Sequence, residues 1–399
     1  MRQKSSLLII FLVVFIDLVS FGIVLPILPF YSQLYGGSAW HLGWLMTSYS
    51  LMQFLIAPLW GRVSDFVGRR PVILISVLGT AVSMTVLGIA GSLQWLFIGR
   101  ILAGIFGANI TTAYAYIVDV TTEDERAKGM GLIGAAFGLA FIFGPAIGGM
   151  LSRYGYGIPM FVGAILALCN FIFALLKLEE PHLSSVSRST HRYKRFDFDA
   201  VRLALADGRT RFAIALNFMV TFALVQLEVT LALYMGARYQ YDAESVGVLL
   251  AVLGLLLIVV QTGVVRQLSL KYGERNLILT GTAMGAAALA IFPSTSLIPV
   301  VLLSLCLVSI AQGLLGPSLA SVASMGAPSQ RRGSTMGVFQ SAGSIARLVG
   351  PPCAGWLFDH ISWRSPYFGG SFFLIAAFVV TIVWSLFSGR RSSMYPETA

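Results

Sequence analysis

The stretch "GRVSDFVGRRPVIL" (61–74) places one aspartate and three arginines between two long apolar runs. Charge is scarce elsewhere, since only 11% of the chain is charged and 57% is hydrophobic. An ordinary globular domain carries about a quarter of its residues as charged side chains. Glycines at 61 and 68 permit a turn with positive φ or a close approach of backbones. The stretch therefore predicts a short polar connection between two membrane-spanning helices.

Apolar runs of about 20 residues recur along the whole chain, which is the signal of membrane-spanning α-helices. These runs are continuous and do not alternate in polarity, which excludes a transmembrane β-barrel. The first run carries Asp17 and lacks a small-residue cleavage site, so we expect it to remain as a span. The fold class is an all-α membrane protein with twelve transmembrane helices. The predicted spans are 6–30, 41–60, 71–90, 94–118, 129–151, 158–177, 210–235, 244–265, 276–292, 297–320, 333–357 and 366–388.

Most of the basic residues behind the net charge of +10 lie on one side of the predicted topology. When the N-terminus and every second loop lie on one side, the opposite side keeps only Arg153, Arg238 and Arg364. This asymmetry follows the positive-inside rule and places both termini in the cytoplasm. We expect the apolar surface of the helices to contact the lipid bilayer. Because the basic residues are placed by topology, we expect no nucleic-acid partner.

The two halves of the chain resemble each other. A shift of 206 residues places Gly144-Pro145 on Gly350-Pro351 and Gly149 on Gly355. Repeats in the same orientation indicate two pseudo-symmetric six-helix bundles related by an axis along the membrane normal, an arrangement typical of transporters. A polar stretch that mixes both charge signs separates the halves and reads as a cytoplasmic linker with a short surface helix. The predicted segments are 1–178, 179–209 and 210–399.

The residues of the opening stretch allow two interpretations. Asp65 can cap a helix or pair with an arginine, and Arg69 and Arg70 can anchor to the membrane surface. Pro71 suits the first turn of the next helix. The stretch is either a tight turn that obeys the positive-inside rule or an ionic latch between helix ends.

The same stretch resembles the loop signature of the major facilitator superfamily, a Gly-x-x-x-Asp-x-x-Gly-Arg-Arg pattern between spans two and three. "GLAFIFGPAIGG" (138–149) resembles the antiporter motif of the twelve-span drug:proton antiporter branch. "GRILAGIFGAN" (99–109) resembles the arginine-bearing motif of span four in that branch. "FIDLVSFGIVLPILPFYSQ" (15–33) is similar to the first span of bacterial tetracycline exporters.

The resemblance implies a latch that closes the cytoplasmic side, and an antiporter motif in span five. In the second copy Leu270 and Glu274 stand where Asp65 and Arg69 stand, so we expect the latch to be asymmetric. The motif glycines also suit ordinary close helix packing. The implied latch residues are Gly61, Asp65, Gly68, Arg69, Arg70 and Asp119. The implied antiporter motif comprises Gly138, Gly144, Pro145, Gly148 and Gly149.

Four ionisable residues inside predicted spans are candidates for proton coupling or substrate binding, since a charge at the bilayer centre costs about 2.5–3.5 kcal/mol on insertion scales. Asp17 is a proton site or forms a structural pair with an arginine. Glu228 is a second proton site, a counter-charge or a hydrogen-bonded acid. The resemblance gives Arg100 a role in proton relay, with an anchor near the interface as the alternative. Arg347 neutralises Glu228 or Asp17, binds an anionic substrate, or forms a fixed pair.

The sequence therefore predicts a proton-coupled exporter of small lipophilic or amphipathic compounds that works by alternating access. The alternatives are export of a metabolite or siderophore, and proton-coupled uptake. Acids that tetracycline exporters carry in spans three and nine correspond here to Ser83 and Met284, which argues against a tetracycline chelate.

The sequence contains no Walker loop and no metal-spaced cysteines or histidines, so we expect no cofactor, no metal and no enzyme. Short loops suggest a bacterial inner membrane, and a monomer is the default of the family.

Overall fold

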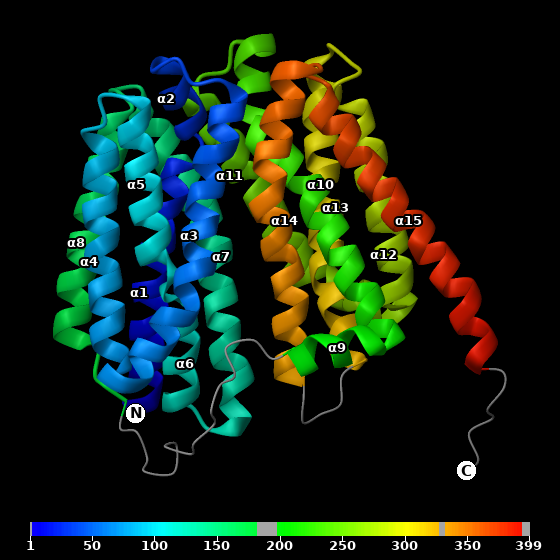
Figure 1. Ribbon diagram of the computed structural model, residues 1–399, viewed down its shortest axis with the longest axis horizontal. Helices are drawn as coiled ribbons and strands as arrows, with labels where there is room; N and C mark the ends of the chain where they lie inside the picture. The colour runs from blue at the N-terminus through cyan, green and yellow to red at the C-terminus, as the bar shows by residue number, and fades with distance from the viewer. Residues whose placement is uncertain (1, 182–197, 327–331, 393–399) are drawn as a thin grey trace. The chain divides into compact units, whose positions relative to one another are not determined.

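The computed structural model describes residues 2–181, 198–326 and 332–392, and within these ranges it contains helices and no strand (Figure 1). Ten stretches of the described residues are long and apolar enough to cross a membrane. One of them, Ala243–Ile291, covers two predicted spans, and a further long helix, α14 (Arg332–His360), covers the span predicted over 333–357. The predicted all-α class is therefore confirmed.

Helices in the first half follow the predicted spans with two interruptions. The first run breaks after Val24 because Pro26 lacks an N–H and Pro29 occupies the first turn of the next helix. Span four is divided by a single 3-10 turn, η1. The elements are α1 (Arg2–Val24), α2 (Leu28–Leu34), α3 (Ala39–Val67), α4 (Arg69–Gly88), α5 (Leu93–Phe106), η1 (Gly107–Asn109), α6 (Ile110–Val120), α7 (Glu123–Ser152) and α8 (Gly157–Lys177).

The second half begins with α9, a short helix that corresponds to the surface helix expected near the end of the linker, and residues 182–197 of that linker lie outside the described residues. A π-helical turn, η3, joins α11 to α12. Gly273 takes a φ of +77° inside α12, where the sequence predicts a loop between spans eight and nine. The elements are α9 (Phe198–Ala206), α10 (Gly208–Tyr239), α11 (Ala243–Val259), η3 (Val260–Val264), α12 (Val265–Ile291), α13 (Ile298–Met325), α14 (Arg332–His360) and α15 (Ser365–Ser392).

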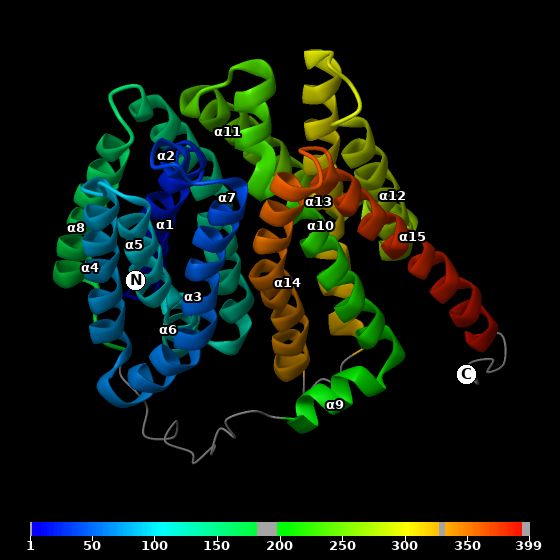
Figure 2. The ribbon, with the colours of Figure 1, turned by 45° about the horizontal axis from the view of Figure 1, so that its top comes forward.

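Backbone contacts divide the chain into two compact units. The first contains Met1–His191 together with Leu231–Leu255, and the second contains Arg192–Thr230 together with Leu256–Ala399. In the first unit α1 packs against α7 and α8, and α4 packs against α5 and α8 (Figures 1 and 2). In the second unit α12 packs against both α13 and α15. The division into bundles at 1–178 and 210–399 stays a prediction.

Candidate functional site

Asp17 lies within α1 and is only 8% exposed. The Asn109 side-chain amide donates a hydrogen bond of 3.3 Å to its Oδ2 atom, and among the described residues its Oδ1 atom has no hydrogen-bond partner. A charge in an apolar interior is costly unless it is paired and fully hydrogen-bonded. This carboxyl therefore suits a group that exchanges a proton better than one that holds a permanent ion pair, and no arginine pairs with it among the ion pairs of the described residues.

Arg100 lies on α5, 3% exposed, and aromatic rings provide its surroundings. Its guanidinium carbon lies 4.4 Å from the ring centroid of Tyr49 and 5.9 Å from that of Phe21, which follows Asp17 by one helical turn. Its Nε atom donates a long bond of 3.4 Å to the Leu45 carbonyl. A cation over aromatic faces is stabilised without an anion. Arg100 is thus buried among helices of the first unit, and both its role in proton relay and its role as an anchor near the interface stay predictions.

The 3-10 turn in span four is held by two amide side chains that the sequence analysis missed. Asn109 ends the turn and reaches Asp17 on α1. Gln53 on α3 donates to the Gly107 carbonyl at 3.1 Å and to the Tyr49 hydroxyl at 3.3 Å. The available signal was the presence of amides in otherwise apolar runs, because a buried amide in a membrane needs partners.

Three of the predicted latch residues meet at one end of the first unit. An Arg69 guanidinium nitrogen lies 2.6 Å from the Asp65 carboxylate, and its Nε atom lies 2.9 Å from Asp119. Arg69 also donates to the Ser64 hydroxyl at 2.6 Å. One guanidinium therefore joins the end of α3, the start of α4 and the end of α6.

The other predicted latch residues behave differently. Arg70 donates to the Leu175 carbonyl at 2.7 Å, and it does not appear in the ion pairs found among the described residues. The helix α3 continues beyond the predicted span 41–60 to Val67, so the connection between α3 and α4 shrinks to Gly68. Gly61 accordingly lies inside a helix with open space around it, so neither a turn nor a close approach requires glycine there. Gly68 does require it, with a φ of +108°.

Glu180 is a further residue of this region that the sequence did not reveal. Its two carboxylate oxygens accept the backbone N–H groups of Arg69 at 2.6 Å and Arg70 at 2.9 Å. The first N–H groups of a helix have no partner within it, and a negative charge is favourable at that end. Glu180 therefore anchors the start of α4 while the Arg69 side chain joins the helix ends.

The second copy keeps the geometry but reverses the charge, as the sequence predicted. Gly273 has a φ of +77°, like Gly68, and the next residue is Glu274 in place of an arginine. The Glu274 carboxylate accepts hydrogen bonds of 3.1 Å from Ser269 and from Ser321. This copy is thus held by hydrogen bonds from serines.

Glu228 and Arg347 pair in the second unit, between α10 and α14, at 3.8 Å. Their side chains are 46% and 55% exposed. Of the alternatives left open for Arg347, the structure pairs it with Glu228. The pair is long and accessible, so it contributes little to stability by itself.

Three glycines of span five, Gly144, Gly148 and Gly149, lie where helix backbones touch. A Cβ atom on Gly144 would lie 2.6 Å from the Cα atom of Gly22 on α1. A Cβ atom on Gly149 would lie 2.9 Å from the Cα atom of Gly247 on α11. Close packing therefore requires glycine at Gly144 and Gly149, as the helix-packing interpretation of the motif expects. A role of the motif in antiport stays a prediction. The predicted motif lies wholly on α7, at Gly138, Gly144, Pro145, Gly148 and Gly149.

Long apolar helices that carry a buried carboxyl and an aromatic-bound guanidinium are typical of an integral, multi-pass membrane transporter. The sequence model that describes the Major Facilitator Superfamily matches this chain over residues 10–351 and 267–397. The chain belongs to this family of membrane transporters, which confirms the expectation of a transporter and not an enzyme.

Known relatives cover nearly the whole chain. The chain is 32% identical over 359 residues to the class G tetracycline resistance protein of Vibrio anguillarum, with 88% of this chain and 89% of that protein covered. It is 27% identical to multidrug resistance protein 2 of Bacillus subtilis (strain 168), with 96% of each covered. The fold matches the crystal structure of the human organic anion transporter MFSD10 (TETRAN) at a TM-score of 0.71 and 24% identity, over 96% of this chain and 100% of that chain.

Proposed function

We propose that this protein exports small lipophilic or amphipathic compounds in exchange for protons, by alternating access. Relatives named for tetracycline resistance and multidrug resistance align with about nine-tenths of the chain or more, and their names support export of drug-like compounds. The charge distribution supports a bacterial inner membrane with both termini in the cytoplasm, and the family default supports a monomer.

The observation that carries the coupling proposal is the burial of Asp17 without a cationic partner. Its polar neighbours are the neutral side chains of Asn109 and Thr80, and no cation pairs with it among the described ion pairs. Ionisation leaves an uncompensated charge in the apolar interior, and protonation removes it. A substrate that brings polar or cationic groups to this carboxyl stabilises the ionised form, so substrate and proton exclude each other.

Arg100 supports the same proposal from α5. Its charge is held by Tyr49 and Phe21 and no carboxylate pairs with it among the described residues, so it keeps a fixed positive potential in this part of the unit. Phe21 lies one helical turn from Asp17 on α1, so this cation and the carboxyl belong to the same proposed coupling site.

The span-three position where tetracycline exporters carry an acid is occupied here by a buried serine. Ser83 donates to the Gly79 carbonyl at 2.7 Å within its own helix, so it presents no carboxylate for a metal chelate. The Met284 side chain packs against an apolar cluster that includes Leu277 and Leu314. These positions favour metal-free lipophilic substrates.

The test is substrate-induced proton release from the purified full-length protein in detergent, followed with a pH-sensitive dye while tetraphenylphosphonium and neutral lipophilic compounds are added. We expect release from the wild type and none from Asp17→Asn, whose amide oxygen still accepts the Asn109 bond. Glu228→Gln is the matched control and should retain release. Loss in Glu228→Gln alone would move the coupling to the second unit, and no release from the wild type near neutral pH would refute proton exchange.

A further inference from the structure

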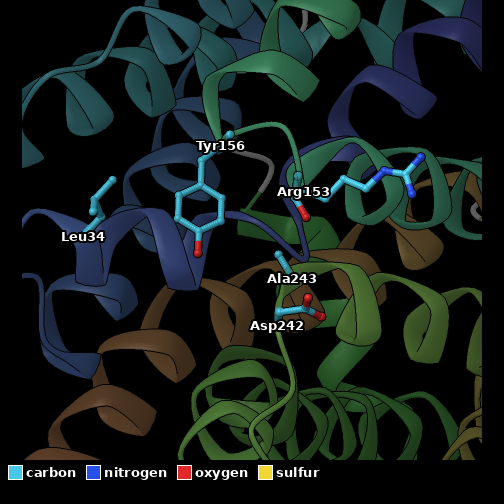
Figure 3. Close-up of a pocket in the computed structure, with 7 residues that line it drawn as sticks. Leu34, Arg153, Tyr156, Asp242 and Ala243 are labelled. Carbon is cyan, nitrogen blue, oxygen red and sulfur yellow. The ribbon is translucent and has the colours of Figure 1, made fainter.

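Two adjoining cavities lie at the helix ends opposite the latch, in the first unit. Their volumes are about 410 and 390 Å³, and Tyr156 and Asp242 line both. Figure 3 shows these two side chains in the first cavity, which is formed by the α7–α8 connection, α2 and the start of α11. Volumes in this range are typical of small-molecule sites.

The lining of the second cavity combines aromatic rings with one carboxylate. Phe30, Tyr156 and Tyr241 provide the rings, Asp242 provides the charge, and no lysine or arginine is among the described residues that line this cavity. Arg153 lines the first cavity, but its guanidinium points away in Figure 3 and lies 4.8 Å from the ring centroid of Tyr154. The balance of charge in the cavities is therefore negative.

The position of Asp242 at the start of α11 favours the ionised form of its carboxyl. The backbone N–H of Ser245 donates to its Oδ1 atom at 2.8 Å at the start of α11, and this bond lowers the pKa of the carboxyl. Burial, and then the charge of Asp242, raise the pKa of the Tyr156 hydroxyl. The carboxylate and the ring thus act on the same space.

The aromatic walls are fixed before any ligand arrives. The Tyr156 ring packs against Tyr31 with centroids 5.7 Å apart. A Cβ atom at Gly236 would lie 3.0 Å from the Phe30 ring, so α10 approaches that ring closely. Gln240, which lines the second cavity, is the one non-glycine residue with positive φ in the described part of the chain, at +57°. Backbone strain of this kind gathers at ligand sites.

We propose that Phe30, Tyr156, Tyr241 and Asp242 form an outer aromatic site that binds lipophilic organic cations. A quaternary ammonium or phosphonium group is attracted to aromatic faces and to a nearby carboxylate, and its apolar substituents fill the remaining volume. Hard metal ions prefer several oxygen ligands, which a single carboxylate does not supply. With the proposed export function and topology, on which this assignment of side rests, the site lies where an exported compound leaves, and it does not include Asp17.

The test is equilibrium binding of labelled tetraphenylphosphonium to the purified full-length protein, with no gradient and in the Asp17→Asn background, so that proton coupling plays no part. We expect Asp242→Asn to weaken binding at least tenfold. Asparagine caps a helix as well as aspartate, so α11 keeps its start. Glu244→Gln removes an acid two residues away, outside both cavities, and should bind as the background protein does.

A second pair of variants separates the contribution of the Tyr156 ring to binding from that of its hydroxyl group. Tyr156→Phe should keep most of the affinity and Tyr156→Leu should lose it, because only the ring faces the cation. Triphenylphosphine oxide, a neutral analogue, should not distinguish Asp242→Asn from the background protein. Equal affinity in Asp242→Asn and the background, or an equal loss in Glu244→Gln, would overturn the proposal. The first result would place the cation elsewhere, and the second would reduce the effect to general surface charge.

Discussion

Removal of the Glu180 carboxylate should release the start of α4. Among the described residues, the amides of Arg69 and Arg70 have this side chain as their acceptor, at 2.6 and 2.9 Å. Loss of a side-chain cap costs about 0.5–2 kcal/mol. A free-energy cost of this size corresponds to a factor of roughly 2–30 in an equilibrium. Glu180→Ala should therefore speed hydrogen exchange at the two amides by about that factor.

The measurement is hydrogen exchange with residue-level fragmentation on the protein in detergent. The Thr210 amide is an internal control, because Asp207 caps it at 2.7 Å at the start of a different helix, and its exchange should not change. Glu180→Gln keeps one carbonyl acceptor, so its effect should lie between those of wild type and Glu180→Ala. Unchanged exchange at Arg69 and Arg70 in Glu180→Ala would refute the capping role.

A double-mutant cycle with Gly68→Ala sharpens the prediction. Gly68 has a φ of +108° and a ψ of 160°, a conformation that costs other residues about 1–3 kcal/mol. A Cβ atom there would also lie 2.7 Å from the Glu180 carboxylate and displace it. In the Glu180→Ala background only the backbone strain remains, so the two changes together should cost about 1–2 kcal/mol less than their sum. Strict additivity would show that Gly68 and Glu180 do not interact.

Two further predictions concern the spans. Gly247→Ala places a Cβ atom against the Pro145 carbonyl and 2.7 Å from the Gly149 Cα. Neither backbone can yield easily, so the substitution should destabilise the protein by about 1–3 kcal/mol. Its lower thermal midpoint in detergent would contrast with an unchanged one for Gly134→Ala, which meets open space. Arg100→Gln should abolish substrate-induced proton release, whereas Arg100→Lys should keep part of it because a lysine still places a cation over the rings. Equal release from the two variants would show that the positive charge is not needed.

The helices were predictable because a membrane span is a signal carried by consecutive residues. Apolar length alone locates α4, α8 and α15, and Gly68 with its neighbours marks a turn of the chain. Interruptions were harder to predict. Pro26 breaks the first run by its chemistry, but η1 contains no proline and depends on contacts with other helices.

Side-chain partners were predictable only where a motif linked them. The pairing of Arg69 with Asp119 followed from the resemblance. Glu180 was missed because it lies at the start of a polar linker, 111 residues from Arg69, where carboxylates are common. Asn109 was missed because a single amide does not indicate which of many helices it will face. Such partners are set by three-dimensional packing, which a one-dimensional pattern does not encode.

Span four connects the candidate proton site to the latch. Asn109 bonds Asp17 at the break in this span, and Asp119 bonds Arg69 at its far end, so the helix α6 lies between the two contacts. When Asp17 becomes neutral, it ceases to be a charged acceptor for the Asn109 amide, and charge-assisted hydrogen bonds are about twice as strong as neutral ones. In the proposed exchange, the weakened bond frees the η1 turn to straighten or to bend further. Because α6 is a continuous helix from that turn to Asp119, we propose that a change in the turn moves the latch acid relative to Arg69, whose backbone N–H is bonded to Glu180.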